Sequence, residues 1–234
     1  MAKSRNVILI QPEFARRAEA DAAFIFEPDE LKCRKLVRCQ VKGRGVTYFF
    51  HFNGVACVLR HYWRGGFMQR LSRDGYLWLG LKRNRAYREW TILEKLREFG
   101  LPAPRPVALR IRRDGWLCRS DIVTTEIENS QSLGQLLREK YLHAGDWGKI
   151  GRQIRAFNDN GVFHRDLNAN NILLDGEQVY LIDFDRACLC WGNGWKPLVL
   201  RRLKRSLEKL SRMHVGFHYS ADNWKSLLSG YESS

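Results

Sequence analysis

The sequence lacks the features that mark several common classes of protein. No uncharged stretch approaches the roughly 20 apolar residues that cross a bilayer, and the apolar run at 7–10 is too short for a signal-peptide core. The six cysteines show no paired Cys-x-x-Cys spacing with histidine partners, so no zinc site is predicted. There is no internal repeat or low-complexity tract. We therefore expect a cytoplasmic protein whose cysteines are reduced and serve mainly in packing.

The composition that is present describes an ordinary soluble chain with a strong positive charge. Hydrophobic residues make up 44% and charged residues 28% of 234 residues, which suits one compact domain or two lobes. Acidic residues are scarce: 25 stand against 40 lysines and arginines, for a net charge of +15. This surplus predicts a polyanionic partner, such as nucleic acid, an acidic membrane surface or a phosphorylated substrate.

The first half of the chain is rich in strand signals. β-branched and aromatic residues dominate 41–63, where Asn53-Gly54 predicts a hairpin turn between two antiparallel strands. A helix is predicted at 84–99, with Ala86, Trp90, Leu93, Leu96 and Phe99 on one face. Two further strands follow at 107–111 and 116–127, and the first forty residues form an entry segment with no clear pattern.

The second half is predicted to be mainly helical. Helices are expected at 132–143, then from a cap at Asp146, and in the basic tail from 196; the strands NILL and VYLI lie between them. The tail helix could lie in a membrane interface, but packing on the rest of the chain is the preferred interpretation. The layout predicts an α+β fold with two lobes, a strand-rich N-lobe at 1–128 and a helix-rich C-lobe at 129–234.

One constellation in the second half carries specific chemistry. The sequence HRDLNANNILLD at 164–175 is followed by YLIDFD at 180–185, which matches the order and spacing of a kinase catalytic loop and metal-binding strand. Asp166 is predicted to accept the proton of an attacking hydroxyl, and Asn171 and Asp183 to bind Mg²⁺ on the phosphates of ATP. A four-residue turn at 175–178 would place Asn171 opposite Ile182, beside Asp183. The alternative is that these are turn and capping residues.

The first half should then supply the groups that hold the nucleotide. Gly43 and Gly45 lie between predicted strands and could let backbone amides approach a phosphate, although an ordinary turn has the same pattern. Arg60 ends a strand where protein kinases have lysine, and Glu89 on the predicted helix is its expected partner. Glu89 could instead pair with a neighbouring arginine. Glu126 and Ile127 are candidates for main-chain contact with adenine.

These segments together resemble the lipopolysaccharide kinases, which include kinases of 3-deoxy-D-manno-octulosonic acid (Kdo). The likeness is carried in order by KGRGVTYFF, VLRHYWRGG, AYREW, GVFHRDLNANNILLD and YLIDFDRA, which span about 42 to 187. It implies a protein-kinase-like fold and ATP-dependent phosphorylation of the 4-hydroxyl of Kdo on the lipid A precursor. It also implies a peripheral place at the cytoplasmic face of the bacterial inner membrane.

The expected partners are therefore a Kdo-bearing lipid A precursor and an anionic membrane surface. No Ala-Pro-Glu follows Asp183, and Asp185 replaces the glycine of Asp-Phe-Gly, so no protein substrate is expected. No nucleic-acid motif accompanies the basic stretches at 61–88 and 195–212. Two alternatives remain: a phosphotransferase of the aminoglycoside or choline-kinase type, and a basic membrane-binding protein with a degenerate kinase core.

Overall fold

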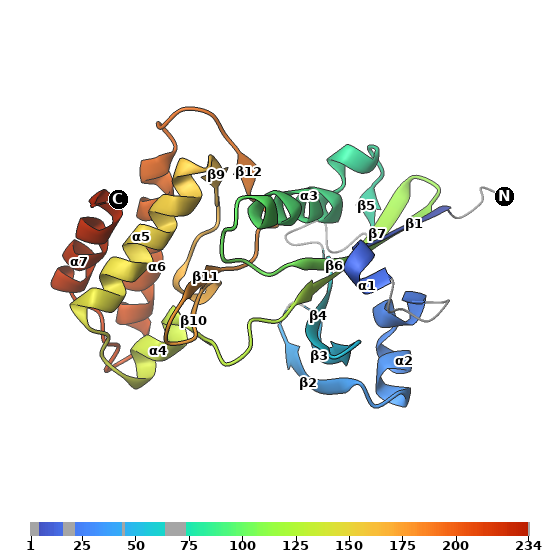
Figure 1. Cartoon of the computed structure of the whole chain (residues 1–234), viewed down its shortest axis with the longest axis horizontal. Coiled ribbons are helices and arrows are strands. Elements are labelled where there is room, and N and C mark those ends of the chain that lie inside the picture. The colour runs from blue at the N-terminus through green and yellow to red at the C-terminus, as the bar shows by residue number, and fades with distance from the viewer. Residues whose placement is uncertain (1–4, 16–21, 44, 64–73, 234) are drawn as a thin grey trace. The chain divides into compact units, whose positions relative to one another are not determined.

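The computed structural model describes residues 5–15, 22–43, 45–63 and 74–233. The chain divides into two compact units (Figure 1). The first unit comprises Met1–Glu94 and Pro104–Glu126, and the second comprises Lys95–Ala103 and Ile127–Ser234. Each unit has its own sheet and its own buried apolar side chains, so each is described by itself.

The first unit is built on a seven-stranded antiparallel sheet. Its order is β1-β6-β7-β4-β3-β2, and the short β5 pairs with β7. The strands are β1 (Arg5–Ile10), β2 (Val37–Lys42), β3 (Val46–Phe52), β4 (Val55–His61), β5 (Tyr76–Leu77), β6 (Pro106–Asp114) and β7 (Leu117–Thr125). The predicted hairpin turn is confirmed, because Asn53 and Gly54 both have positive φ angles, 52° and 76°, between the paired residues Phe52 and Val55.

Two strands differ from the sequence-based expectation. β1 lies in the entry segment to which no structure was assigned, and it forms an edge of the sheet by pairing antiparallel with β6, with Val7 opposite Ile111. β2 (Val37–Lys42) begins before the predicted 41–63 region, and β3 follows from Val46, with Gly43 and Gly45 between the two strands. Both strands lie at the edges of the sheet and form by pairing with the neighbouring strand. This cause is tertiary, so the local sequence pattern does not reveal it.

Short helices cover one face of this sheet and close its core. They are α1 (Pro12–Ala15), the 3₁₀ turn η1 (Ala22–Phe26) and α2 (Pro28–Cys33). Ile25, Phe26 and Leu31 are buried against strand residues that include Phe50 and Val123. Residues of the predicted strands and residues of the entry segment, to which no structure was assigned, thus fill this core together.

Helix α3 (Arg85–Glu98) confirms the helix predicted at 84–99, and the 3₁₀ turn η3 (Leu81–Arg83) precedes it. It begins where the side-chain oxygen of Asn84 accepts hydrogen bonds from the amides of Ala86 and Tyr87 at 3.0 and 3.1 Å. Four of its five predicted apolar positions are buried. Phe99 is the exception: it is 40% exposed, because it follows the last helical residue and leaves the buried stripe.

The second unit combines helices with short strand pairs. The helices are α4 (Leu133–Glu139), α5 (Ala144–Asp159), the 3₁₀ turn η4 (Ala169–Asn171), α6 (Lys196–Met213) and α7 (Ala221–Glu232). The strands are β8 (Gln131–Ser132), β9 (Val162–Phe163), β10 (Ile172–Leu174), β11 (Val179–Leu181) and β12 (Cys188–Leu189). β10 pairs with both β11 and β8, and β12 pairs with β9, all antiparallel.

Two helix boundaries correct the sequence-based expectation. α4 ends at Glu139 rather than 143, because the amide of His218 donates to the carbonyl of Leu137 at 2.8 Å and satisfies that helix end. Asp146 is not the N-cap of α5. His143 takes that position, and Asp146 lies three residues later, where its carboxylate accepts from the amide of His143 at 3.2 Å.

α5 and α7 pack directly on each other, as Figure 1 shows. A Cβ atom at Gly151 would lie 2.0 Å from the carbonyl oxygen of Leu227, so only glycine allows this approach. The basic helix α6 buries Val199, Leu203 and Leu207, which confirms the preferred interpretation of a packed tail helix. No helix among the described residues is long and apolar enough to span a membrane.

Candidate functional site

The catalytic-loop sequence lies between β9 and η4 in the second unit, and a buried histidine joins it to the strand that follows. His164 is 2% exposed, and its Nε2 lies 3.0 Å from the carbonyl oxygen of Ile182. Burial lowers the pKa of His164, so the ring is neutral and Nε2 carries the proton that Ile182 accepts. This bond ties the loop that contains Asp166 to the residue before Asp183.

The β10–β11 hairpin brings the two predicted metal ligands together. The amide of Ile182 donates to the carbonyl of Asn171 at 3.0 Å, which confirms that these residues lie opposite each other. Asp183 is therefore one residue from the position that faces Asn171. Asn171 Nδ2 donates to the carbonyl of Asp166 at 3.1 Å, so the side-chain oxygen is the atom of Asn171 that could bind a cation. Asp183 has a φ of 64°, an unusual angle for aspartate and typical of functional sites.

Asp166 has a cationic partner that the sequence pattern did not reveal. Arg202 on α6 donates to Asp166 Oδ1 from Nη2 at 2.7 Å and from Nε at 3.2 Å. The two side chains are 35% and 33% exposed, so the pair remains open to solvent and to ligands. Arg202 is 36 residues away in sequence, and only the packing of α6 on the catalytic loop brings it here.

The first unit contains the second group of predicted residues. Glu89 is 1% exposed and accepts hydrogen bonds from Arg60 Nη2 and from the hydroxyl of Tyr62. The expected ion pair between β4 and α3 is therefore present, and Tyr62 is an additional donor that sequence reasoning missed. A buried carboxylate needs such partners, because an unpaired charge at 1% exposure is strongly unfavourable.

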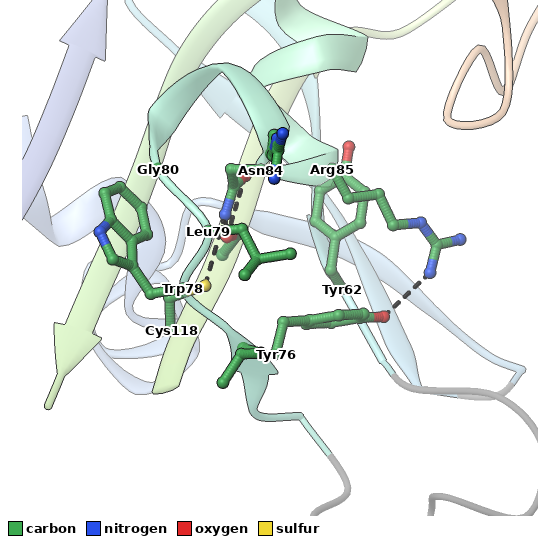
Figure 2. A pocket seen from close by; sticks show the side chains of 11 residues that line it. Tyr62, Tyr76, Trp78, Leu79, Gly80, Asn84, Arg85 and Cys118 are labelled. Carbon is green, nitrogen blue, oxygen red and sulfur yellow. Dashed lines mark hydrogen bonds between the residues drawn. The ribbon is translucent and has the colours of Figure 1, made fainter. Parts of the chain in front are cut away.

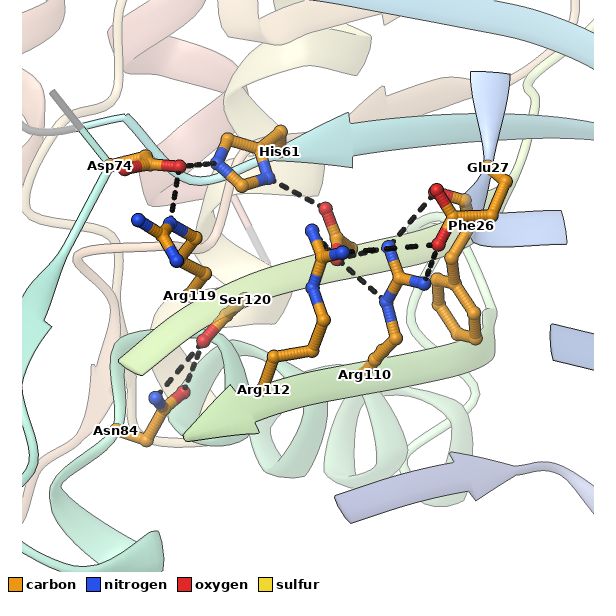
Figure 3. Close-up of polar contacts among 10 residues, drawn as sticks. Phe26, Glu27, His61, Asp74, Asn84, Arg110, Arg112, Arg119 and Ser120 are labelled. Atoms are coloured by element: carbon orange, nitrogen blue, oxygen red, sulfur yellow. Dashed lines mark hydrogen bonds and ion pairs between the residues drawn. The ribbon is translucent and has the colours of Figure 1, made fainter. Parts of the chain in front are cut away.

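A polar network next to Arg60 fixes the end of β4 (Figure 3). Asp121 on β7 is 4% exposed and accepts from His61 Nδ1 at 2.6 Å and from Arg110 Nε at 2.9 Å. His61 also pairs with Asp74, and Arg110 with Glu27. The network joins β4, β6 and β7 through side chains as well as backbone, so Arg60 projects from a strand that is held firmly in place.

The turn between β2 and β3 contains the two predicted glycines. The amide of Gly43 donates to the carbonyl of Gly45 at 2.8 Å, which closes a tight turn. A Cβ atom at Gly45 would lie 1.8 Å from Nε1 of Trp63, so the indole packs against the bare backbone there. Trp63 Nε1 is buried and has no hydrogen-bond partner among the described residues. This orphaned donor beside the glycine turn was not identified from sequence.

The end of β7 leads into the segment predicted to contact adenine. The amide of Glu126 donates to the carbonyl of Ala56 at 2.9 Å, and its carboxylate pairs with Arg38. The amide of Glu126 is therefore engaged in sheet pairing. The carbonyl of Glu126 is the main-chain group of this residue that could contact a ligand. The hydroxyl of Ser130 donates to the carbonyl of Ile127 at 2.6 Å, so the amide is the group of Ile127 best suited to adenine.

Comparison with known proteins now identifies the family. Residues 33–231 match the lipopolysaccharide kinase (Kdo/WaaP) family. The chain belongs to this family. It is 40% identical over 225 residues to a 3-deoxy-D-manno-octulosonic acid kinase of Haemophilus influenzae, covering 92% of each chain. It is 36% identical over 210 residues to a kinase of the same name from Vibrio vulnificus, covering 89% of each.

Solved structures establish the fold of this lipopolysaccharide kinase. The chain is similar to WaaP in complex with acyl carrier protein, with a TM-score of 0.62, 18% identity, and coverage of 97% of this chain and 89% of that one. It is also similar to a Rio2 kinase from Chaetomium thermophilum, with a TM-score of 0.52, 20% identity, and coverage of 88% and 69%. The expected α+β protein-kinase-like fold is confirmed, and a kinase of this family uses ATP as phosphate donor.

The residues of this lipopolysaccharide kinase fit a magnesium ion better than a metal that needs a dense protein cage. Within the described ranges no group of three or more histidine, cysteine, aspartate or glutamate side chains could hold an ion. The predicted ligands Asn171 and Asp183 could supply two oxygens from adjoining positions of one hairpin. Mg²⁺ commonly binds one or two protein oxygens and takes its other ligands from phosphates and water, so this sparse set suits it.

Proposed function

We propose that this protein is a Kdo kinase of lipopolysaccharide core biosynthesis, which transfers the γ-phosphate of ATP to the 4-hydroxyl of Kdo on the lipid A precursor. The acceptor is inferred from relatives that are 40% identical over 92% of the chain. The observation that supports the chemistry is the pairing of Ile182 with Asn171, because it gathers two oxygen ligands beside the loop of Asp166.

In the proposed mechanism, Asp166 orients the acceptor hydroxyl and takes its proton as the oxygen attacks the γ-phosphorus, while the bond from that phosphorus to the bridging oxygen breaks and ADP leaves. The Arg202 pair occupies Asp166 Oδ1, so Oδ2 is the oxygen we assign to the substrate proton. Asn171 and Asp183 would hold Mg²⁺, which would neutralise charge on the phosphates when bound. His164 keeps the two segments in register through its bond to Ile182.

Residues of the first unit, together with Ile127 of the second, are assigned to the nucleotide. Arg60, fixed by Glu89, would donate to phosphate oxygens, and its planar fork can give two hydrogen bonds where a lysine gives a point charge. The glycine turn at Gly43 and Gly45 would cover the phosphates. Trp63 Nε1 would be a further donor for them, because it lies beside this turn and no described residue is its hydrogen-bond partner. The carbonyl of Glu126 and the amide of Ile127 would contact adenine.

We also propose peripheral docking at the cytoplasmic face of the inner membrane through an exposed edge of the first unit. Leu77, Leu79 and Trp116 are 53%, 57% and 80% exposed, and the amide of Trp78 bonds to the carbonyl of Trp116 at 2.8 Å. A hollow of about 280 Å³ lies at this edge. Figure 2 shows Trp78 and Leu79 among the side chains that line it. The partner is an anionic bilayer, since exposed Lys82 and Arg83 adjoin the apolar side chains. The basic sequence at 68–73 lies outside the described residues.

The decisive experiment measures transfer from labelled ATP with magnesium to two acceptors, the Kdo-capped lipid A precursor and the same precursor without Kdo. We expect label only on the Kdo-bearing acceptor, and its loss in Asp166→Asn with ATP binding retained. Label on a different small molecule would favour another phosphotransferase. Retained transfer in Asp166→Asn would contradict the assignment of the base.

A further inference from the structure

A basic hollow lies beside the catalytic loop in the second unit, outside the residues assigned to ATP and magnesium. It has a volume of about 510 Å³. One wall is the loop, through Asn168 and Asn170, and the other is α6, through Arg202, Arg205 and Lys209. Ser206 joins the two walls, because its hydroxyl accepts from the amide of Ala169 at 3.2 Å.

Two of the three cations of this hollow have no ion-pair partner among the described residues. Arg202, Arg205 and Lys209 recur at helical spacing and so lie along one side of α6, spanning about 10 Å. Arg202 pairs with Asp166, but neither Arg205 nor Lys209 has an ion-pair partner within the part of the chain that the structure describes. Three cations with one carboxylate, gathered around a concavity, favour an anionic ligand.

The far end of the hollow is lined by apolar side chains instead of cations. Leu210 and Met213 line it there, and Met213 is 62% exposed. From Arg202 to Met213 the helix axis advances by about 16 Å. The hollow thus offers cations near Asp166 and apolar side chains at the other end, an order that suits a sugar bearing a phosphate group and, beyond it, acyl chains.

We propose that this hollow binds the acceptor, with a phosphate group of the glycolipid on Arg205 and Lys209 and the start of an acyl chain on Leu210 and Met213. This inference rests on the proposed function, since it concerns the acceptor of that reaction. Binding there places the sugar next to Asp166, and the Arg202 pair holds that carboxylate at the mouth of the hollow.

The test compares two double variants that remove equal charge from one helix. The double variant Arg205→Gln with Lys209→Gln removes the two cations of the hollow that have no ion-pair partner among the described residues. Arg201→Gln with Arg212→Gln is the control, because these residues lie on α6 but do not line the hollow. We expect the first to raise the KM for the Kdo-bearing acceptor by about 10-fold or more, with the KM for ATP unchanged, and the control to resemble the unmodified protein.

A second arm removes the phosphates of the acceptor enzymatically. With the dephosphorylated acceptor, we expect the kcat/KM of the unmodified protein to fall by a factor similar to that caused by the double variant Arg205→Gln with Lys209→Gln, called the hollow variant. The kcat/KM of the hollow variant itself should fall no further. Equal kinetics of the two double variants would overturn the proposal while the proposed function stands. If the unmodified protein transfers no phosphate to this acceptor, the proposed function fails. In that case, the binding of the phosphorylated lipid A precursor, monitored by tryptophan fluorescence, tests the role of the hollow separately. Weaker binding by the hollow variant but not by the control variant supports the proposal.

Discussion

Replacement of Arg60 by methionine tests whether one side chain serves both the fold and the nucleotide. The change removes a cation from Glu89, which is 1% exposed, and leaves the hydroxyl of Tyr62 as a donor to that carboxylate. Loss of one partner of a buried pair costs about 3–5 kcal/mol. The Arg60 side chain is 29% exposed, so solvent screening brings the expected loss of stability down to about 2–3 kcal/mol.

The companion change Glu89→Gln separates the two roles. In the double variant Arg60→Met with Glu89→Gln, the buried carboxylate is removed together with its cation. We therefore expect the stability of the double variant to return to within about 1 kcal/mol of the unmodified protein. Thermal unfolding reads this out: a loss of 2–3 kcal/mol corresponds to a fall of about 5–10 °C in Tm for a chain of this size. Phosphate transfer should nevertheless stay about 10²- to 10³-fold low in both variants, because both lack the donor to the phosphates.

Arg60→Lys is the matched control. It keeps the charge and loses the planar fork, so we expect a Tm near that of the unmodified protein and an intermediate activity. The reasoning is refuted if the double variant is as unstable as Arg60→Met, since the loss of the cation beside the Glu89 carboxylate would then not be the cause of the instability. It is also refuted if the double variant regains full activity, since Arg60 would then not position phosphate.

Three further predictions concern other parts of the chain. Burial lowers the pKa of His164 below its ordinary value of 6.5. Between these two values the unfolded chain therefore binds a proton that the folded protein does not. Stability should be fully present above pH 6.5 and fall by up to about 1.4 kcal/mol per pH unit between 6.5 and the lowered pKa, and His164→Gln should flatten that slope in urea unfolding at pH 5.5–7.5. Gly151→Ala should cost about 1–3 kcal/mol by forcing α5 from α7, whereas Gly145→Ala, whose Cβ meets nothing within 4 Å, should cost nothing. Trp116→Ser should weaken binding to anionic vesicles several-fold, and added salt should weaken it in both proteins; salt-independent binding would contradict the electrostatic part of the docking proposal.

The parts of the fold that were predicted correctly depend on local sequence. The Asn53-Gly54 turn, the helix after Asn84 and the β10–β11 hairpin each have residues whose own conformational preferences specify them. The register that sets Asn171 opposite Ile182 followed from counting along one hairpin. The boundaries that were wrong, at Glu139 and at Asp146, are places where a distant amide or a neighbouring cap decided where a helix ends or begins.

What the sequence alone determined is therefore the set of candidate groups, namely a carboxylate, two candidate oxygen ligands and a cation, and the short strands and turns that position them. What only the tertiary structure decided is which distant groups meet them. Arg202 reaches Asp166, and Trp63 lies against Gly45, because packing brings together segments that no period in the sequence relates. Burial also depends on the whole fold, and burial is the reason that Glu89 requires its partners and His164 stays neutral.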